Sequence, residues 1–129
     1  IEHLEGDMDK QHAVDYLVNI YAVMASDGDV ERSESRVFEV IARGIGAGFF
    51  ERKKAIETYE ASKTTATLSG RWSDKVRNLE DMLFAAYCNG SLAPDEKEIV
   101  VAQARVLGIE KEQLTVIKTE AKQRFEAFR

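Results

Sequence analysis

The residues of this chain best suited to chemistry are the acidic side chains of two short segments, SDGDVERSE at positions 26–34 and CNGSLAPDE at positions 88–96. Each segment has Asp or Asn before a glycine, an aliphatic residue two places after the glycine, and a glutamate six places after it. This spacing is that of the second half of an EF-hand loop, which binds calcium through oxygen ligands. A calcium site is therefore the first hypothesis.

The first half of an EF-hand loop is missing from both segments. The loop needs oxygen ligands at its first and third positions. Counting back from each glycine places Val23 and Ala25 there in the first segment, and Ala85 and Tyr87 in the second. None of the four offers a carboxylate, so the ligand count argues against a complete EF-hand loop in either segment.

The same residues fit a turn between two helices. Gly28 and Gly90 can adopt the left-handed backbone that ends a helix. Pro94 favours a helix start, because proline suits the first helical position. Glu34 and Glu96 then fall at the third helical position, where a carboxylate accepts from unpaired backbone N–H groups and meets the positive end of the helix dipole. A capping role is thus predicted for both glutamates.

A metal site remains as a second hypothesis if the two turns approach each other. Their side chains would then supply oxygen ligands to one hard divalent cation such as calcium. The candidate ligands are Asp27, Asp29, Glu31 and Glu34 from the first turn, and Asn89, Asp95 and Glu96 from the second.

The two turns belong to a longer internal repeat. Adding 62 to a position maps Val14 to Val76, Leu17 to Leu79 and Gly46 to Gly108, and continues without a gap through the turns. Two copies of a helix-turn-helix unit are predicted, at about 9–46 and 73–108. Such a unit cannot bury its apolar stripe alone, so the copies should pack together, about a pseudo-two-fold axis.

The apolar spacing predicts an all-α fold. Apolar residues recur three and four positions apart, and no segment alternates with a period of two. With 129 residues the chain should form a single domain, 1–129, a compact bundle of about six helices built from the two units. The helices are predicted at about 8–25, 31–45, 50–61, 72–87, 93–107 and 114–128.

Charge and composition exclude several classes of protein. The formal net charge is −5, and residues 1–62 hold most of the acidity, so a nucleic-acid ligand is not expected. No apolar run is long enough to cross a membrane, and the acidic start does not resemble a signal peptide. The single cysteine, Cys88, fits a reducing compartment, so a cytoplasmic location is expected.

Catalytic patterns are weak. His3 and His12 lie nine residues apart, which is not the spacing of a helical metal pair, and both are predicted at the surface. Cys88 has no evident histidine partner and is predicted to be a partly buried thiol. Trp72 is predicted to be a core anchor. Neither an enzyme nor a bound organic cofactor is expected.

The segments ASDGDVERSE and AYCNGSLAPDEKEIVVAQARVLGIEKEQL resemble the TerB-like tellurite-resistance domain, over roughly residues 14–125. The family's hallmark is a helix ending in small residues, then DG, an aliphatic residue, a polar helix start and a glutamate. Asn89 departs from the usual aspartate. Asp27, Glu34 and Glu96 match the acidic positions that the resemblance implies.

The resemblance implies a bacterial, non-enzymatic scaffold or interaction domain linked to tellurite and other stress responses, with a protein partner and a divalent cation. The alternative is a regulatory module of a larger membrane-associated or co-chaperone protein, without a metal. No J-domain signature occurs in the chain. The final helix carries the apolar stripe Leu114, Ile117, Ala121, Phe125 and Phe128, which would dock a partner helix wherever it is uncovered.

Overall fold

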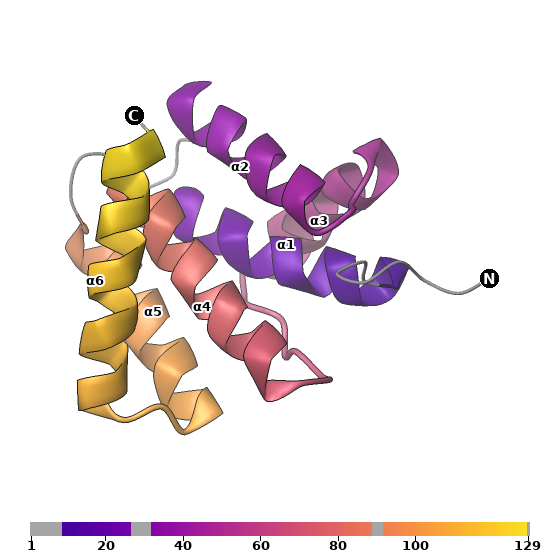
Figure 1. The fold of residues 1–129 in the computed structure, drawn as a ribbon. Coiled ribbons are helices and arrows are strands. Elements are labelled where there is room, and N and C mark those ends of the chain that lie inside the picture. The colour runs from indigo at the N-terminus through magenta and orange to yellow at the C-terminus, as the bar shows by residue number, and fades with distance from the viewer. Residues whose placement is uncertain (1–8, 27–31, 89–91, 129) are drawn as a thin grey trace.

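The computed structural model describes residues 9–26, 32–88 and 92–128, apart from the side chains of residues 32–34. These residues form six α-helices and no strand (Figure 1), so the predicted all-α bundle is confirmed. The helices are α1 (Lys10–Met24), α2 (Arg32–Gly44), α3 (Phe49–Ser62), α4 (Trp72–Tyr87), α5 (Pro94–Leu107) and α6 (Lys111–Phe128).

Side-chain caps fix the starts of the helices. The Asp9 carboxylate accepts a hydrogen bond of 2.9 Å from the His12 N–H at the start of α1. Helix α5 begins with Pro94, and the Glu96 carboxylate accepts from the Ala93 N–H at 2.9 Å. Each bond pairs a backbone donor that a helix start leaves without an intrahelical partner.

Equivalent glycines end α2 and α5. Gly46 and Gly108 have φ values of +80° and +74°, a left-handed backbone that side chains with a Cβ resist. The residue after each glycine donates its N–H to the carbonyl five positions back, at 2.8 Å after Gly46 and 2.9 Å after Gly108. Both helices therefore end in the same hydrogen-bonded motif, 62 positions apart.

Helices α1 and α4 form the centre of the bundle. Helix α1 packs on α2, α3, α4 and α5, while α4 packs on α1, α2, α5 and α6. Helices α3 and α6 lie at opposite edges (Figure 1). Each packed pair has a counterpart when α1, α2 and α3 are exchanged with α4, α5 and α6: for example, α1 packs on α3 as α4 packs on α6. That is the pattern expected of two halves related by a pseudo-two-fold axis, although the internal repeat itself stays a prediction.

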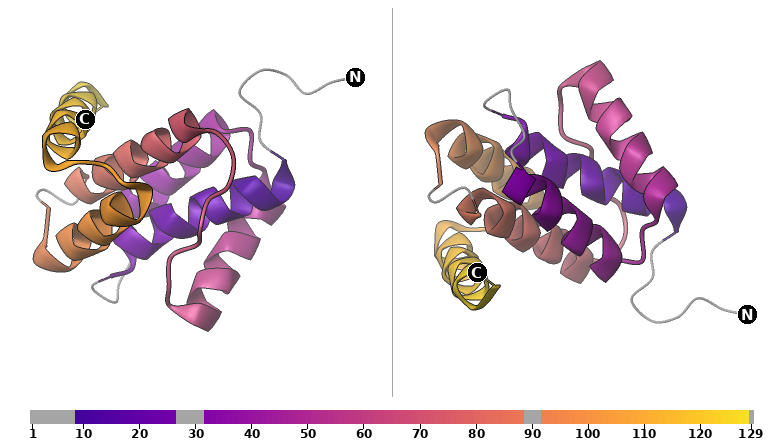
Figure 2. Two further views of the ribbon diagram at one scale, coloured as in Figure 1. Left: turned by 90° about the horizontal axis from the view of Figure 1, so that it is seen from below. Right: turned by 90° about the horizontal axis from the view of Figure 1, so that it is seen from above.

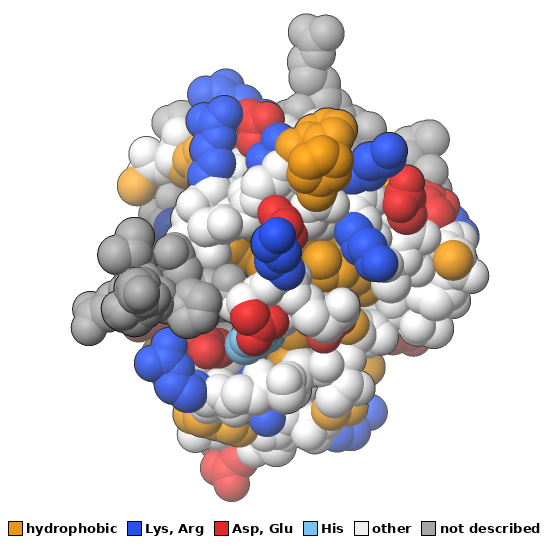
Figure 3. Space-filling view, turned by 90° about the vertical axis from the view of Figure 1, so that its right-hand side faces the viewer, with side chains coloured by type: hydrophobic (Ala, Val, Ile, Leu, Met, Phe, Trp, Pro, Cys, Tyr) orange, Lys and Arg blue, Asp and Glu red, His pale blue; other side chains and the backbone are white. Residues whose placement is uncertain are grey.

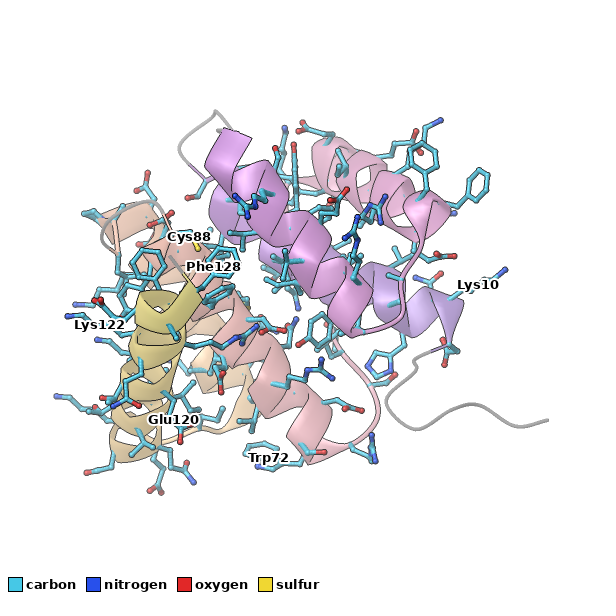
Figure 4. All side chains as sticks on the ribbon, turned by 45° about the horizontal axis from the view of Figure 1, so that its top comes forward. Lys10, Trp72, Cys88, Glu120, Lys122 and Phe128 are labelled. Atoms are coloured by element: carbon cyan, nitrogen blue, oxygen red, sulfur yellow. The ribbon has the colours of Figure 1, made fainter. Side chains whose placement is uncertain are left out.

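The core is centred on the two central helices, and all six helices contribute buried side chains to it. Its largest fully buried side chains include Tyr16, Leu17, Met82 and Phe84, and each buried apolar side chain of this size contributes about 1.5–3 kcal/mol. The prediction that Trp72 is a core anchor is wrong, because its side chain is 51% exposed at the start of α4 (Figure 4). No described helix combines the length and the apolar character that crossing a membrane requires.

The connection between α3 and α4 crosses α1 (Figure 2, left). The Asn19 side chain holds it there, because its Oδ1 accepts from the Ala66 N–H at 2.7 Å and its Nδ2 donates to the Ala66 carbonyl at 3.1 Å. Leu68 of the same connection is buried. The connection is therefore fixed to the core by the buried amide of Asn19.

Candidate functional site

The structure tests only part of the predicted metal site. Asp27, Asp29, Glu31 and Asn89 lie outside the described residues, as does the side chain of Glu34, which occupies the first turn of α2. Asp95 and Glu96 both lie in the first turn of α5. Across residues 9–26, 32–88 and 92–128, no group of three or more His, Cys, Asp or Glu side chains could hold a metal ion.

Asp95 and Glu96 occupy different environments. Asp95 is exposed, whereas Glu96 is only 3% exposed and its carboxylate caps α5 through the Ala93 N–H. The predicted capping role of Glu96 is confirmed. A cation at this turn would have to share the Glu96 carboxylate with the helix start.

A concave surface lies between α5 and α6. It is a groove of about 450 Å³, within the range of ligand sites in proteins. Both helices pack on α4 but scarcely on each other, so the groove opens between them over Leu83 of α4. Its lining consists of Leu83, Leu92, Lys97, Val100, Val101, Ala104, Arg105, Ile109, Lys111, Leu114, Thr115 and Lys118.

Helical periodicity places mainly apolar side chains in the middle of this groove and cations at its corners. On α5, Val100, Val101 and Ala104 lie between Lys97 and Arg105. On α6, Leu114 and Thr115 lie between Lys111 and Lys118. These positions recur three and four apart, so each set occupies one helix face.

The four cations, Lys97, Arg105, Lys111 and Lys118, have no acidic neighbour in the groove. The lining contains no carboxylate, and within the described part of the chain none of the four makes an ion pair. The formal net charge of the whole chain is −5. This groove is thus a local basic site on an acidic domain.

A related groove of about 540 Å³ lies between α2 and α3. Seven of its eight lining residues map onto residues of the α5–α6 groove when 62 is added to their numbers, and the eighth, Glu57, maps to Thr119 just outside it. The lining is Ser35, Phe38, Glu39, Phe49, Arg52, Lys53, Ile56 and Glu57.

The α2–α3 groove balances its charges internally. Arg43 beside it pairs with Glu39 at 3.3 Å, and Lys53 pairs with Glu57 at 4.0 Å. The face of the molecule on the right of Figure 1, where α3 lies, likewise interleaves acids and bases (Figure 3). The acids have no counterpart in the second half, because an offset of 62 maps Glu39 to Val101 and Glu57 to Thr119.

A buried polar network ties α1, α4 and α6 together. The Tyr16 hydroxyl donates to Asp81, whose other carboxylate oxygen accepts from Arg124 Nη1 at 2.5 Å. The same Arg124 nitrogen donates to Glu80 at 3.1 Å, and the guanidinium stacks 4.3 Å from the centre of the Phe84 ring. The side chain of Asp81 is 3% exposed, so its charge is compensated by these partners rather than by water.

The network shifts the pKa values of its members. Burial, with the nearby Asp81 charge, raises the pKa of Tyr16 far above its ordinary value. Burial lowers the pKa of Arg124, but Asp81 and Glu80 outweigh it and raise that pKa overall. Tyr16 is therefore a neutral donor and Arg124 a permanent cation, which suits a structural joint better than proton transfer.

Sequence reasoning missed this network, although the predicted 62-residue offset contained a signal for it. Tyr16 and Asn78 are 62 apart, as are Asn19 and Asp81. The Tyr16 hydroxyl donates to Asp81, and the Asn19 Nδ2 donates to Asn78 Oδ1 at 2.9 Å. An offset of 62 therefore relates the residues of one hydrogen bond to the residues of the other. Polar residues at positions 62 apart, each within the apolar stripe of its helix, thus indicated polar contacts between the two predicted units.

The remaining chemistry-bearing side chains do not converge. His12 is partly exposed beside Gly70, and its buried Nε2 has no hydrogen-bond partner among the described residues. Cys88 is partly buried, as predicted, at the end of α4 near Phe128 (Figure 4). His3 lies outside the described residues.

Comparison with protein-family models, with curated proteins and with solved structures finds no match for this chain. The TerB-like resemblance therefore stays a prediction from the two turn motifs.

Proposed function

We propose that this chain is a non-enzymatic interaction domain that binds a protein partner through the α5–α6 groove. The observation that carries the proposal is the combination of an apolar floor with an uncompensated basic rim. The groove holds no carboxylate, imidazole or thiol, the groups that most often act as acid, base or nucleophile. Such a surface supports recognition better than reaction.

The setting we propose is a bacterial stress response of the tellurite-resistance type, and this part rests on the sequence resemblance alone. Deleting the gene in its source organism should increase sensitivity to tellurite, and restoring it should reverse the effect. Unchanged growth in tellurite would favour the alternative, a regulatory module of a larger membrane-associated or co-chaperone protein.

Site-specific cross-linking tests the interaction itself. A photoreactive amino acid at Val101 samples the groove, and one at Thr58, on an exposed part of α3, serves as the control. We expect adducts of one defined mass from Val101 in cells, and none from Thr58. Equal patterns from both positions, or no adduct from Val101, would contradict the proposal.

Filling the groove provides a matched test. Thr115→Trp adds a large side chain at an exposed position of the lining, and Lys53→Trp does the same at the equivalent position of the α2–α3 groove. Only Thr115→Trp should abolish the Val101 adduct. Loss of the adduct in both variants would instead indicate a general disturbance of the bundle.

A further inference from the structure

We infer that the occupant of the α5–α6 groove is an amphipathic helix with an apolar centre and acidic residues at both of its ends. This inference rests on the proposed interaction function and names the chemistry of the partner. An amphipathic helix lying in a groove is a common mode of recognition, in which anchors three and four residues apart enter the apolar floor.

The dimensions of the groove fit about two turns of such a helix. Lys97 and Arg105 are eight residues apart on α5, and at 1.5 Å per residue they mark a span of about 12 Å. Lys111 and Lys118 bound a similar span on α6. The floor between them, formed by residues such as Leu83, would take two or three leucine-sized side chains.

The placement of charge favours acids at both ends of the ligand. Because only residues 108–110 join α5 to α6, Arg105 and Lys111 lie at the connected end of the groove, and Lys97 and Lys118 lie toward the other end. A fatty acid or another amphiphile with one anionic head would meet the cations of one end only. A helix with acids in its first and last turns would meet both pairs.

The α2–α3 groove differs from the α5–α6 groove in that it contains acidic side chains. Its apolar side chains are Phe38, Phe49 and Ile56, and Glu39 and Glu57 pair with its bases or their neighbours. An acidic ligand would meet like charge there, which costs affinity. Only the second groove therefore selects an acid-flanked helix.

The probe is a fluorescein-labelled helical peptide of about 16 residues, with leucines spaced three and four apart over its central two turns and glutamates directly before and after this cluster. The comparison peptide has lysines in place of those glutamates. Fluorescence anisotropy with the full chain should show the glutamate peptide binding at least about tenfold more tightly. The difference should shrink as salt rises, because screening weakens exposed charge pairs.

Two charge-reversal variants assign the binding to the groove. Lys97→Glu with Lys118→Glu reverses one end, and Arg43→Glu with Lys54→Glu makes the same net change outside it. The first pair should weaken the glutamate peptide at least about tenfold and strengthen the lysine peptide. The second pair should leave the preference between the peptides unchanged.

The inference is overturned if the two peptides bind alike, if the control pair weakens binding as much as the groove pair, or if decanoate binds where the glutamate peptide does not. These results leave the cross-linking test of the interaction function intact. A Val101 adduct whose partner segment lacks acidic residues would refute the inference and keep the function. Absence of any Val101 adduct would refute the function.

Discussion

The groove between α2 and α3 and the groove between α5 and α6 occupy equivalent positions in the sequence, but they differ in charge. Both form between two helices that pack on a shared central helix and scarcely on each other. In the first, Glu39 and Glu57 balance Arg43 and Lys53. In the second, four cations stand around an apolar floor without an acid.

The comparison teaches that shape and chemistry are set at different levels of this fold. The packing of each helix pair on α1 or α4 determines that a groove exists. A few surface positions, above all Glu39 and its counterpart Val101, determine what the groove attracts. A substitution at the surface can therefore change binding without altering the bundle.

The largest expected effect comes from the joint that fixes α6 beside the second groove. Asp81→Ala removes the acceptor of Tyr16 and Arg124 and leaves both polar groups without their buried partner. We expect the free energy of unfolding to fall by about 3 kcal/mol. Urea denaturation followed by circular dichroism measures this change.

The control for Asp81→Ala is Glu120→Ala on the exposed side of α6 (Figure 4). Its effect should stay within about 0.5 kcal/mol, as is usual for surface positions. Equal losses in the two variants would show that the network contributes no more than an exposed carboxylate.

The second prediction converts one groove toward the other. Val101→Glu places an acid four residues before Arg105, as Glu39 stands before Arg43. The new pair should change stability by no more than about 0.5 kcal/mol. Binding of the glutamate-flanked peptide should nevertheless weaken about tenfold, or about 1.4 kcal/mol. Unchanged affinity would show that charge does not distinguish the grooves.

The third prediction extends the comparison to the helix starts. Glu96→Ala removes the acceptor of the Ala93 N–H and should cost about 1 kcal/mol of unfolding free energy. If the repeat holds at the first turn of α2, Glu34→Ala should cost a similar amount. A loss for Glu96→Ala alone would show that the two helix starts are capped differently.

The smallest expected effect is that of calcium on the two turns. Binding to the native state alone at a concentration equal to Kd would stabilise the protein by about 0.4 kcal/mol. Isothermal titration calorimetry and thermal melting at millimolar calcium test this. Asp27→Asn with Asp95→Asn should abolish the response. A flat titration of the unsubstituted chain would refute the hypothesis of a cation site at the two turns.

Local features of the fold were predictable from the sequence, whereas contacts between distant residues were not. The helix starts at Pro94 and the ends at Gly46 and Gly108 were predictable, because each depends on residues within one or two turns. The prediction for Trp72 was wrong, because the exposure of a side chain at the start of α4 depends on which other segments cover that position. Local sequence does not specify this. The Asp81 and Arg124 pairing joins residues 43 positions apart and leaves no local pattern.

By itself, the sequence determined the helices, the helix ends at Gly46 and Gly108 and the capping glutamate Glu96, because hydrophobic periodicity and cap chemistry are local properties of the chain. Only the tertiary structure decided that α5 and α6 pack on α4 and diverge from each other. That divergence uncovers Val100 and Leu114 between four cations. Local pattern specifies which face of a helix is apolar, but the packing of all six helices decides how much of that face stays open.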